Sequence, residues 1–189
     1  MDAFSYLSVL LSIIIGLGIT QVLQGYRGLL LSRSRVRLYT PTLIWSVLLL
    51  VFSCQLWWAS FGLAGRSEWD FATFSIILLQ TILLYMMCAI ALPDVPPTDE
   101  LNLRDHYYRE VTPFFTISLA MLATSTAKDW MLNGELPGTL NLCFHLLFAA
   151  MSVTALATRR PRAHEAMSLA MIGLIAAYVG LLFARLGQG

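Results

Sequence analysis

Charged side chains are scarce in this chain. Asp, Glu, Lys and Arg make up 12% of its 189 residues, whereas hydrophobic residues make up 58%. That charged share is about half of what an ordinary globular chain carries, and a water-soluble surface needs more. The composition therefore argues against a soluble domain, and the net charge of +1 provides no basic surface for nucleic acid.

Cysteine is scarce too, and the signatures of metal sites and enzymes are missing. Cys54, Cys88 and Cys143 fall in apolar runs with no CxxC pair, so we expect small buried residues rather than metal ligands. The sequence contains no HExxH, GxSxG or Walker loop. We expect no metal, no cofactor and no catalytic residue.

What the sequence has in abundance is long uncharged runs. About 20 helical residues cross a hydrocarbon core of about 30 Å, and continuously apolar runs favour helices over a barrel. The fourth run reaches that length if it continues to Trp130 or Met131. The runs are Ala3–Tyr26, Leu38–Gly65, Phe71–Pro93, Val111–Ala127, Leu136–Thr158 and Ala166–Ala184. They predict an all-α fold in which residues 1–189 form a single bundle of six transmembrane helices.

Helix-terminus signals support these boundaries. Thr40-Pro41 predicts a helix start, Asp70 can cap the third helix, and Asn133-Gly134 predicts a turn. Between the third and fourth helices, Thr98–Glu110 is charged but carries the apolar residues Leu101, Tyr107 and Tyr108. We expect it to form a short interfacial helix, capped by Thr98 or Asp99.

Orientation follows from the arginines, because short cytoplasmic loops carry an excess of basic residues. Alternate links between the helices are rich in arginine, and the other links and the ends carry few basic residues. The arginine-rich set comprises Arg27, Arg33, Arg35, Arg37, Arg104, Arg109, Arg159, Arg160 and Arg162. We expect these links to face the cytoplasm and both chain ends to lie outside.

Small residues recur every four positions on the first and last helices. In lipid, such stripes allow helices to approach closely. The sequence favours packing inside the bundle, with a homo-oligomer interface as the alternative. The residues are Ser8, Ser12, Gly16, Thr20, Ala176, Gly180 and Ala184.

Polar residues inside the apolar runs are the candidates for a functional site, because they are costly in lipid. With the orientation above they fall in the outer half of the membrane or near its middle. If the helix faces that carry them converge, they line an outward-facing cavity or pathway for a small ligand or ion. These residues are Gln55, Gln80, Lys128, Asp129, Asn141, His145 and Tyr178.

Three of them have competing interpretations. Lys128 and Asp129 are adjacent and point about 100° apart on a helix, so they should not pair well with each other. Lys128 can extend to the boundary, whereas Asp129 needs a partner such as His145 or Ser125. His145 can act as a proton relay, although a hydrogen-bonded structural role is favoured.

One resemblance is visible. The opening FSYLSVLLSIIIGLGITQVLQGYRGLL, the link RSRVRLY and the segment WSVLLLVFSCQLWW resemble small bacterial multi-helix inner-membrane proteins of unknown function, with a fainter likeness at LRDHYYR and NLCFHLLF. The resemblance implies a one-domain protein in the bacterial inner membrane. It implies no activity and no site residue.

Three functions remain open. The first is a small channel, transporter or ligand-binding protein that uses the outer polar residues. The second is a non-catalytic subunit or scaffold acting through homo-oligomer or partner contacts. The third, least favoured, is a membrane redox protein or enzyme. Membrane lipid is the expected surrounding, a small ion or molecule is a candidate ligand, and no nucleic acid is expected.

Overall fold

The computed structural model describes residues 3–66, 69–95 and 100–183 and shows an all-α bundle. Its long helices are α1 (Ala3–Leu31), α2 (Thr40–Ser60), α3 (Phe71–Ala91), α4 (Leu103–Asn133), α5 (Thr139–Ala157) and α6 (Pro161–Tyr178). Short elements are the 3-10 turns η1 (Arg33–Arg35) and η2 (Phe61–Leu63), the strands β1 (Val36–Arg37) and β2 (Leu101–Asn102), and a π-helical turn, η3 (Val179–Phe183).

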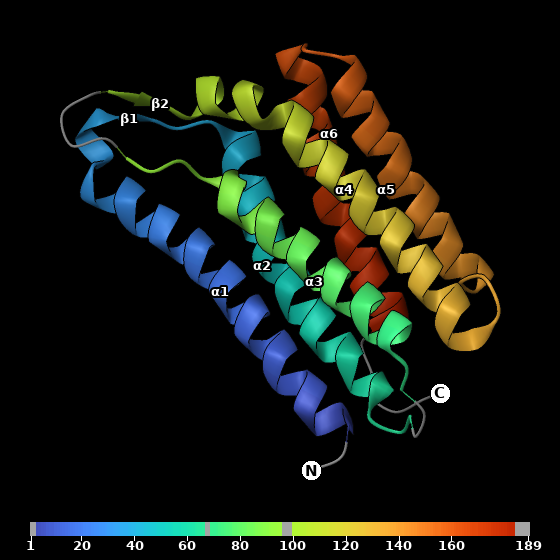
Figure 1. Cartoon of the computed structure of the whole chain (residues 1–189). Coiled ribbons are helices and arrows are strands. Elements are labelled where there is room, and N and C mark those ends of the chain that lie inside the picture. The colour runs from blue at the N-terminus through green and yellow to red at the C-terminus, as the bar shows by residue number, and fades with distance from the viewer. Residues whose placement is uncertain (1–2, 67–68, 96–99, 184–189) are drawn as a thin grey trace.

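The helices form two layers (Figure 1). Helices α1, α3, α4 and α5 pack side by side in that order, and α2 and α6 pack behind them. Helix α2 contacts four of the others, so it is the centre of the bundle. Its buried face supplies Trp45, Leu48 and Leu49 to the main core.

Among the described residues, five helices are long and apolar enough to cross a membrane: Phe4–Leu31, Thr40–Leu63, Phe71–Ala91, Thr139–Ala157 and Pro161–Leu181. These agree with five of the six predicted spans. Helix α4 is not among them, because charged residues occupy its first two turns and Lys128 and Asp129 lie near its end. The 31 residues of α4 extend over about 46 Å, which is long enough to cross a membrane. Its charged residues keep it from meeting the criterion of an apolar span, and the sixth span therefore stays a prediction.

The predicted separate interfacial helix is wrong. Helix α4 begins at Leu103, after Asn102 accepts a hydrogen bond from the Arg104 amide, and continues through Pro113 to Asn133. Pro113 removes one helical hydrogen bond, but Val111, Phe114 and Phe115 are buried around it and keep the helix continuous. Thr98 and Asp99, the predicted caps, lie outside the described residues.

Several local signals are confirmed. Helix α2 begins at Thr40 with Pro41 in its first turn, and the Asp70 carboxylate accepts a hydrogen bond from the Thr73 amide at the start of α3. Gly134 ends α4 with φ of 72°, a left-handed conformation that glycine adopts without strain.

Packing of the small residues inside the bundle, the favoured prediction, does not hold at most of the described positions, and the alternative of a homo-oligomer interface stays a prediction. Gly16 and Thr20 face outward, as do Ala176 and Gly180, and Ser8 is half-buried. Ser12 is also exposed but accepts a hydrogen bond from the Trp57 indole of α2 at 3.2 Å. Ala184 lies outside the described residues. The close approach instead uses Gly18, which faces Cys88 on α3, and Gly25, which faces Leu92 directly after α3. Leu11, Ile15 and Val22 occupy the same buried stripe of α1, and these larger residues turn the Gly16 stripe outward.

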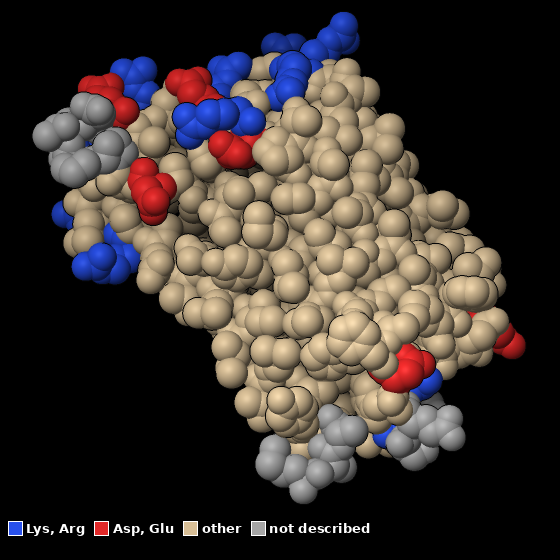
Figure 2. All heavy atoms as spheres, in the orientation of Figure 1, with Lys and Arg blue, Asp and Glu red and all other residues tan. Residues whose placement is uncertain are grey.

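The cysteine prediction holds for Cys88 alone. Cys88 is buried, whereas Cys54 and Cys143 are free thiols on the outside of the bundle. An apolar residue need not be internal in this protein, because the sides of the bundle are themselves apolar. Figure 2 shows charged residues at the two ends and an uncharged band between them.

The arginine-rich links meet at one end of the bundle. Strand β1 pairs in parallel with β2, with Val36 opposite Leu101. Arg159, from the link between α5 and α6, donates hydrogen bonds to the Tyr108 carbonyl at 2.7 Å and to the Thr112 hydroxyl at 2.9 Å. At the opposite end, Arg66 donates to the Leu132 carbonyl at 3.0 Å.

Candidate functional site

A cavity of about 350 Å³ lies between the helices, toward the end that holds Arg66. All the polar residues predicted to form a ligand or ion pathway line it: Gln55, Gln80, Lys128, Asp129, Asn141, His145 and Tyr178. They come from α2, α3, α4, α5 and α6. The structure thus brings them together around one space, and their use as a pathway remains a proposal.

Apolar side chains form most of the cavity wall. Leu11 and Ile15 of α1, Leu84 of α3 and Met121 of α4 are among them. An apolar wall with a few converging polar groups is typical of sites for small molecules, and the volume lies in the range of such sites. Ser60 and Asn133, the last residues of α2 and α4, also line the cavity, so it extends to this end of both helices.

Lys128 and Asp129 both face the cavity. The Lys128 Nζ atom lies 4.0 Å from Asp129 Oδ1, with side chains 19% and 21% exposed. This distance is too long for a hydrogen bond but makes an ion pair, so the prediction that the two residues would not pair with each other is wrong. The predicted partners of Asp129 are wrong, because His145 and Ser125 bond to each other.

His145 is held by two hydrogen bonds. Its Nδ1 lies 2.9 Å from the Asn141 carbonyl, which can only accept, so Nδ1 carries the proton. Its Nε2 lies 3.1 Å from the Ser125 hydroxyl. These bonds fix the ring at the cavity wall and agree with the favoured structural role.

One buried polar atom at the cavity lacks a protein partner among the described residues. The Asn141 Oδ1 atom is buried and accepts no hydrogen bond. Gln80, which is 6% exposed, also lines the cavity. Buried polar groups are normally hydrogen-bonded, so Asn141 Oδ1 indicates a space that water or a ligand fills.

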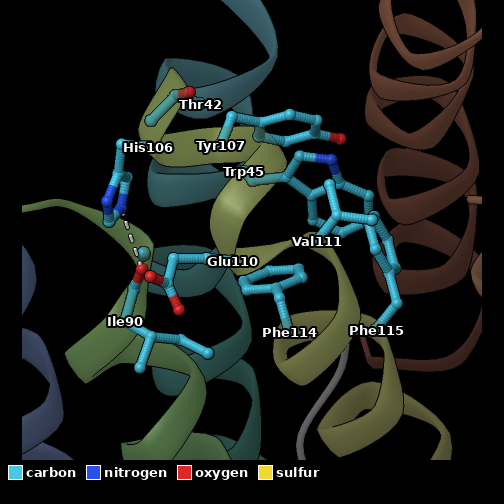
Figure 3. Close-up of a pocket in the computed structure, with 10 residues that line it drawn as sticks. Thr42, Trp45, Ile90, His106, Tyr107, Glu110, Val111, Phe114 and Phe115 are labelled. Carbon is cyan, nitrogen blue, oxygen red and sulfur yellow. Dashed lines mark hydrogen bonds between the residues drawn. The ribbon is translucent and has the colours of Figure 1, made fainter. Parts of the chain in front are cut away.

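The cavity ends at Trp45. The Trp45 ring packs edge-on against Phe114 and Phe115, with centroids 5.4 and 5.2 Å away. Beyond it lies a small pocket of about 20 Å³, enough for about one water molecule. Figure 3 shows its aromatic wall on one side and His106 and Glu110 on the other. Trp45 lines both spaces and separates them.

Beyond this aromatic layer lies a polar cluster that the sequence analysis missed. Tyr107 donates to Nδ1 of the fully buried His164 at 3.0 Å, and His164 Nε2 donates to the Thr158 carbonyl at 2.8 Å. Desolvation raises the pKa of Tyr107, so its hydroxyl stays protonated and remains a donor. Both residues sit in segments that read as links, which is why the sequence did not single them out.

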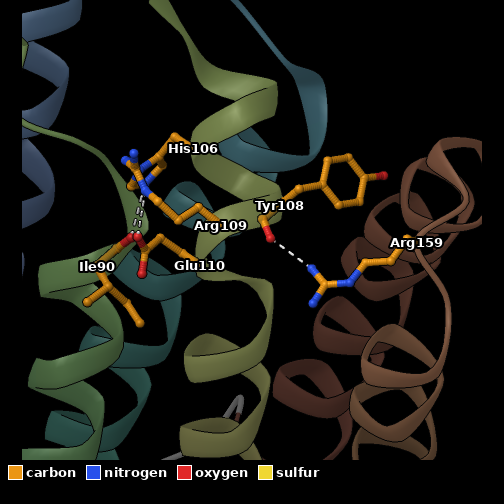
Figure 4. Close-up of polar contacts among 6 residues, drawn as sticks. All are labelled: Ile90, His106, Tyr108, Arg109, Glu110 and Arg159. Carbon is orange, nitrogen blue, oxygen red and sulfur yellow. Dashed lines mark hydrogen bonds and ion pairs between the residues drawn. The ribbon is translucent and has the colours of Figure 1, made fainter.

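His106 precedes Tyr107 in α4 and bonds to other partners. Its Nε2 donates to the Ile90 carbonyl at 3.1 Å, and its Nδ1 accepts from Arg109 at 3.3 Å. Burial lowers the pKa of His106, which keeps the ring neutral as these bonds require. Figure 4 shows His106, Arg109 and Ile90 on one side of α4 and, on its other side, Arg159, which reaches the Tyr108 carbonyl from the link between α5 and α6.

The described residues contain no group of three or more His, Cys, Asp or Glu side chains placed to hold a metal ion. The cavity and the aromatic layer can do two things: hold a polar group between the helices, and close the bundle at Trp45. No protein-family model, curated protein or solved structure matches the chain.

Proposed function

We propose that the chain is a six-span membrane protein that binds a small polar or amphipathic ligand in its outward-facing cavity. One observation carries the proposal: polar residues scattered over α2 to α6 line a single space. Placing that many polar groups in an apolar bundle is costly unless a ligand or water compensates. The arginine-rich end then faces the cytoplasm, and the resemblance favours a bacterial inner membrane.

A receptor or carrier fits this cavity better than an open channel. A channel needs a continuous polar path, and the path stops at the packed rings of Trp45, Phe114 and Phe115. Phe115 is only 1% exposed, so no water column passes it in this conformation. A carrier would have to open this layer, whereas a receptor would not.

The test is the accessibility of the cavity to water from outside. In a variant lacking the three native cysteines, Met121→Cys places a thiol in the cavity wall. Leu147→Cys is the matched control, on the outer face of α5 and 51% exposed toward lipid. A charged, membrane-impermeant thiol reagent added to intact cells should label the first variant and leave the second unlabelled. Labelling of Met121→Cys that requires permeabilised cells would overturn the proposal.

Ion flux into liposomes separates a channel from a binding protein. The purified protein should conduct protons or potassium no faster than protein-free liposomes, because Trp45 closes the path. A flux that disappears in Lys128→Met or Asp129→Asn would instead support a channel through the cavity.

A second candidate function is a homo-oligomeric subunit or scaffold. Ser12, Gly16 and Thr20 on α1 and Ala176 and Gly180 on α6 face outward, where they suit contact with another helix. Gly16→Leu would then dissociate the oligomer in detergent, and an unchanged mass by light scattering would count against this function.

A further inference from the structure

A second hollow lies on the outside of the bundle. It has a volume of about 440 Å³ and is lined by Leu50, Val51, Cys54, Gln55, Trp58 and Val179. Apart from the Gln55 amide and the indole N–H of Trp58, this lipid-side groove is apolar. It follows α2 past the start of the π-helical turn η3, and it faces the surroundings of the bundle rather than its interior. At the proposed depth in the membrane, hydrocarbon is its natural filling.

The lipid-side groove adjoins the internal cavity. Gln55 lines both spaces. On the opposite wall, Tyr178 lines the cavity and its neighbour Val179 lines the groove. The cavity and the groove are therefore separated by Gln55 of α2 on one side and by the junction between α6 and η3 on the other. A π-helical turn is uncommon and often marks a functional position in a helix.

The two spaces differ in the chemistry they accept. The cavity offers the unsatisfied acceptor Asn141 Oδ1 and the Lys128 ammonium, whose one ion-pair partner among the described residues is Asp129, at 4.0 Å and without a hydrogen bond. The Asp129 carboxylate adds hydrogen-bond acceptors, and the buried Gln80 amide can both donate and accept hydrogen bonds. A matching group carries an anion for Lys128 and an N–H donor for Asn141 and Asp129.

We propose that the ligand is a membrane phospholipid with a phosphate and a primary amine in its headgroup, as in phosphatidylethanolamine. One acyl chain lies in the lipid-side groove, and the headgroup passes Gln55 into the cavity. Lys128 pairs with the phosphate, and the ammonium donates to Asp129 and Asn141. This inference rests on the proposed function and adds the class of ligand and its route from the bilayer.

The choice of an amphiphile follows from the shared wall. A water-soluble ligand would use the cavity and leave the groove without a role. A purely apolar ligand would leave Asn141 Oδ1 without a donor and would offer no hydrogen bond to the Lys128–Asp129 ion pair, which is costly in a low-dielectric space. A lipid with a charged headgroup satisfies both spaces at once.

The first experiment measures protection of the cavity by the headgroup. Met121→Cys in the cysteine-free background is reconstituted in vesicles of phosphatidylcholine alone or with phosphatidylethanolamine. Headgroup binding should slow labelling by the impermeant thiol reagent about tenfold, the effect of roughly one charged hydrogen bond. The added Lys128→Met substitution should abolish this difference between the two vesicles.

The outcomes are separable. Rapid labelling of Met121→Cys that is identical in both vesicles leaves the open cavity intact and overturns the lipid ligand. No labelling in either vesicle overturns the proposed function itself.

The second experiment tests the groove with a phosphatidylethanolamine that carries a photoreactive diazirine in its acyl chain. After illumination, peptides containing Val51, Cys54 and Trp58 should carry the probe. Cys54→Trp fills the groove and should reduce this labelling about tenfold, whereas Cys143→Trp, at the other exposed thiol, should not. If Cys54→Trp does not fold, as judged by gel filtration, Val51→Phe replaces it. Equal labelling in the groove and control variants would overturn the inference.

Discussion

At Gly25, helix α1 approaches α3 so closely that no side chain fits. A Cβ atom at this position would lie 2.6 Å from the Leu92 Cβ and 2.8 Å from its Cδ1. Gly25→Ala should therefore destabilise the protein by about 1–3 kcal/mol, the usual cost of overpacking. Gly16→Ala is the control, because a Cβ there meets nothing within 4 Å. Unfolding in a detergent titration measures both, and equal stabilities would contradict the close approach.

Asp70 gives a prediction about pH. Its hydrogen bonds, with the Thr73 amide first among them, hold the pKa of the carboxyl below its ordinary 3.8. A carboxyl whose pKa is lower in the folded state than in the unfolded state stabilises the folded state at pH values above the unfolded-state pKa. That stabilisation is lost as the pH falls through the folded-state pKa, so the affected window lies below pH 3.8.

The matched variant is Asp70→Asn, since asparagine also caps helices but does not titrate. Between pH 6 and pH 3, the thermal midpoint of the native protein should fall more than that of Asp70→Asn. Equal falls would show that the cap is not charge-dependent.

The polar site residues were predictable one by one, and the packing residues were not. Gln55, Gln80 and His145 stand out because almost everything around them in the sequence is apolar. The period of four at Gly16 also stands out, but period alone does not say which stripe faces inward. The inward face of α1 is the one that carries Leu11, Ile15 and Val22, because these larger apolar side chains are buried against the other helices.

At the scale of elements, α4 departs furthest from expectation. Charge and a proline divide its sequence, yet the helix runs unbroken from Leu103 to Asn133. Its first turns are fixed by contacts distant in sequence, such as Tyr107 with His164 and Thr42 with the Leu103 carbonyl. Such contacts follow from the arrangement of the helices, so a reading of local signals could not supply them.

The hydrogen bond between Tyr107 and His164 joins α4 to α6. His164 is fully buried, so Tyr107→Phe would leave its Nδ1 without a donor. A buried polar atom without a partner costs about 1–3 kcal/mol, and the thermal midpoint should fall accordingly. Tyr6→Phe, at a tyrosine that is 72% exposed, is the control. If both variants melt with the native protein, the bond contributes nothing to the association of these helices.

At the scale of the whole molecule, charge separates into two ends with an uncharged band between them (Figure 2). The sequence predicted that arginine-rich and arginine-poor links alternate. The structure adds the contacts that hold the arginine-rich links together at one end of the bundle. Tyr39, directly before α2, packs against Tyr107 of α4, with ring centroids 5.4 Å apart. The sequence predicted the cavity as a hypothesis. The closure at Trp45 and the adjoining groove became visible only in the three-dimensional structure.

The final prediction concerns orientation. In the cysteine-free background, Ser34→Cys and Ala163→Cys place thiols in two arginine-rich segments, and Gly65→Cys places one at the opposite end. An even number of spans and basic cytoplasmic links require the first two to react only after cells are permeabilised, whereas Gly65→Cys reacts in intact cells. If Ser34→Cys and Ala163→Cys reacted on opposite sides, the number of spans between them would be odd. Helix α4 would then not cross, and the cavity that it lines could not open to the outside as proposed.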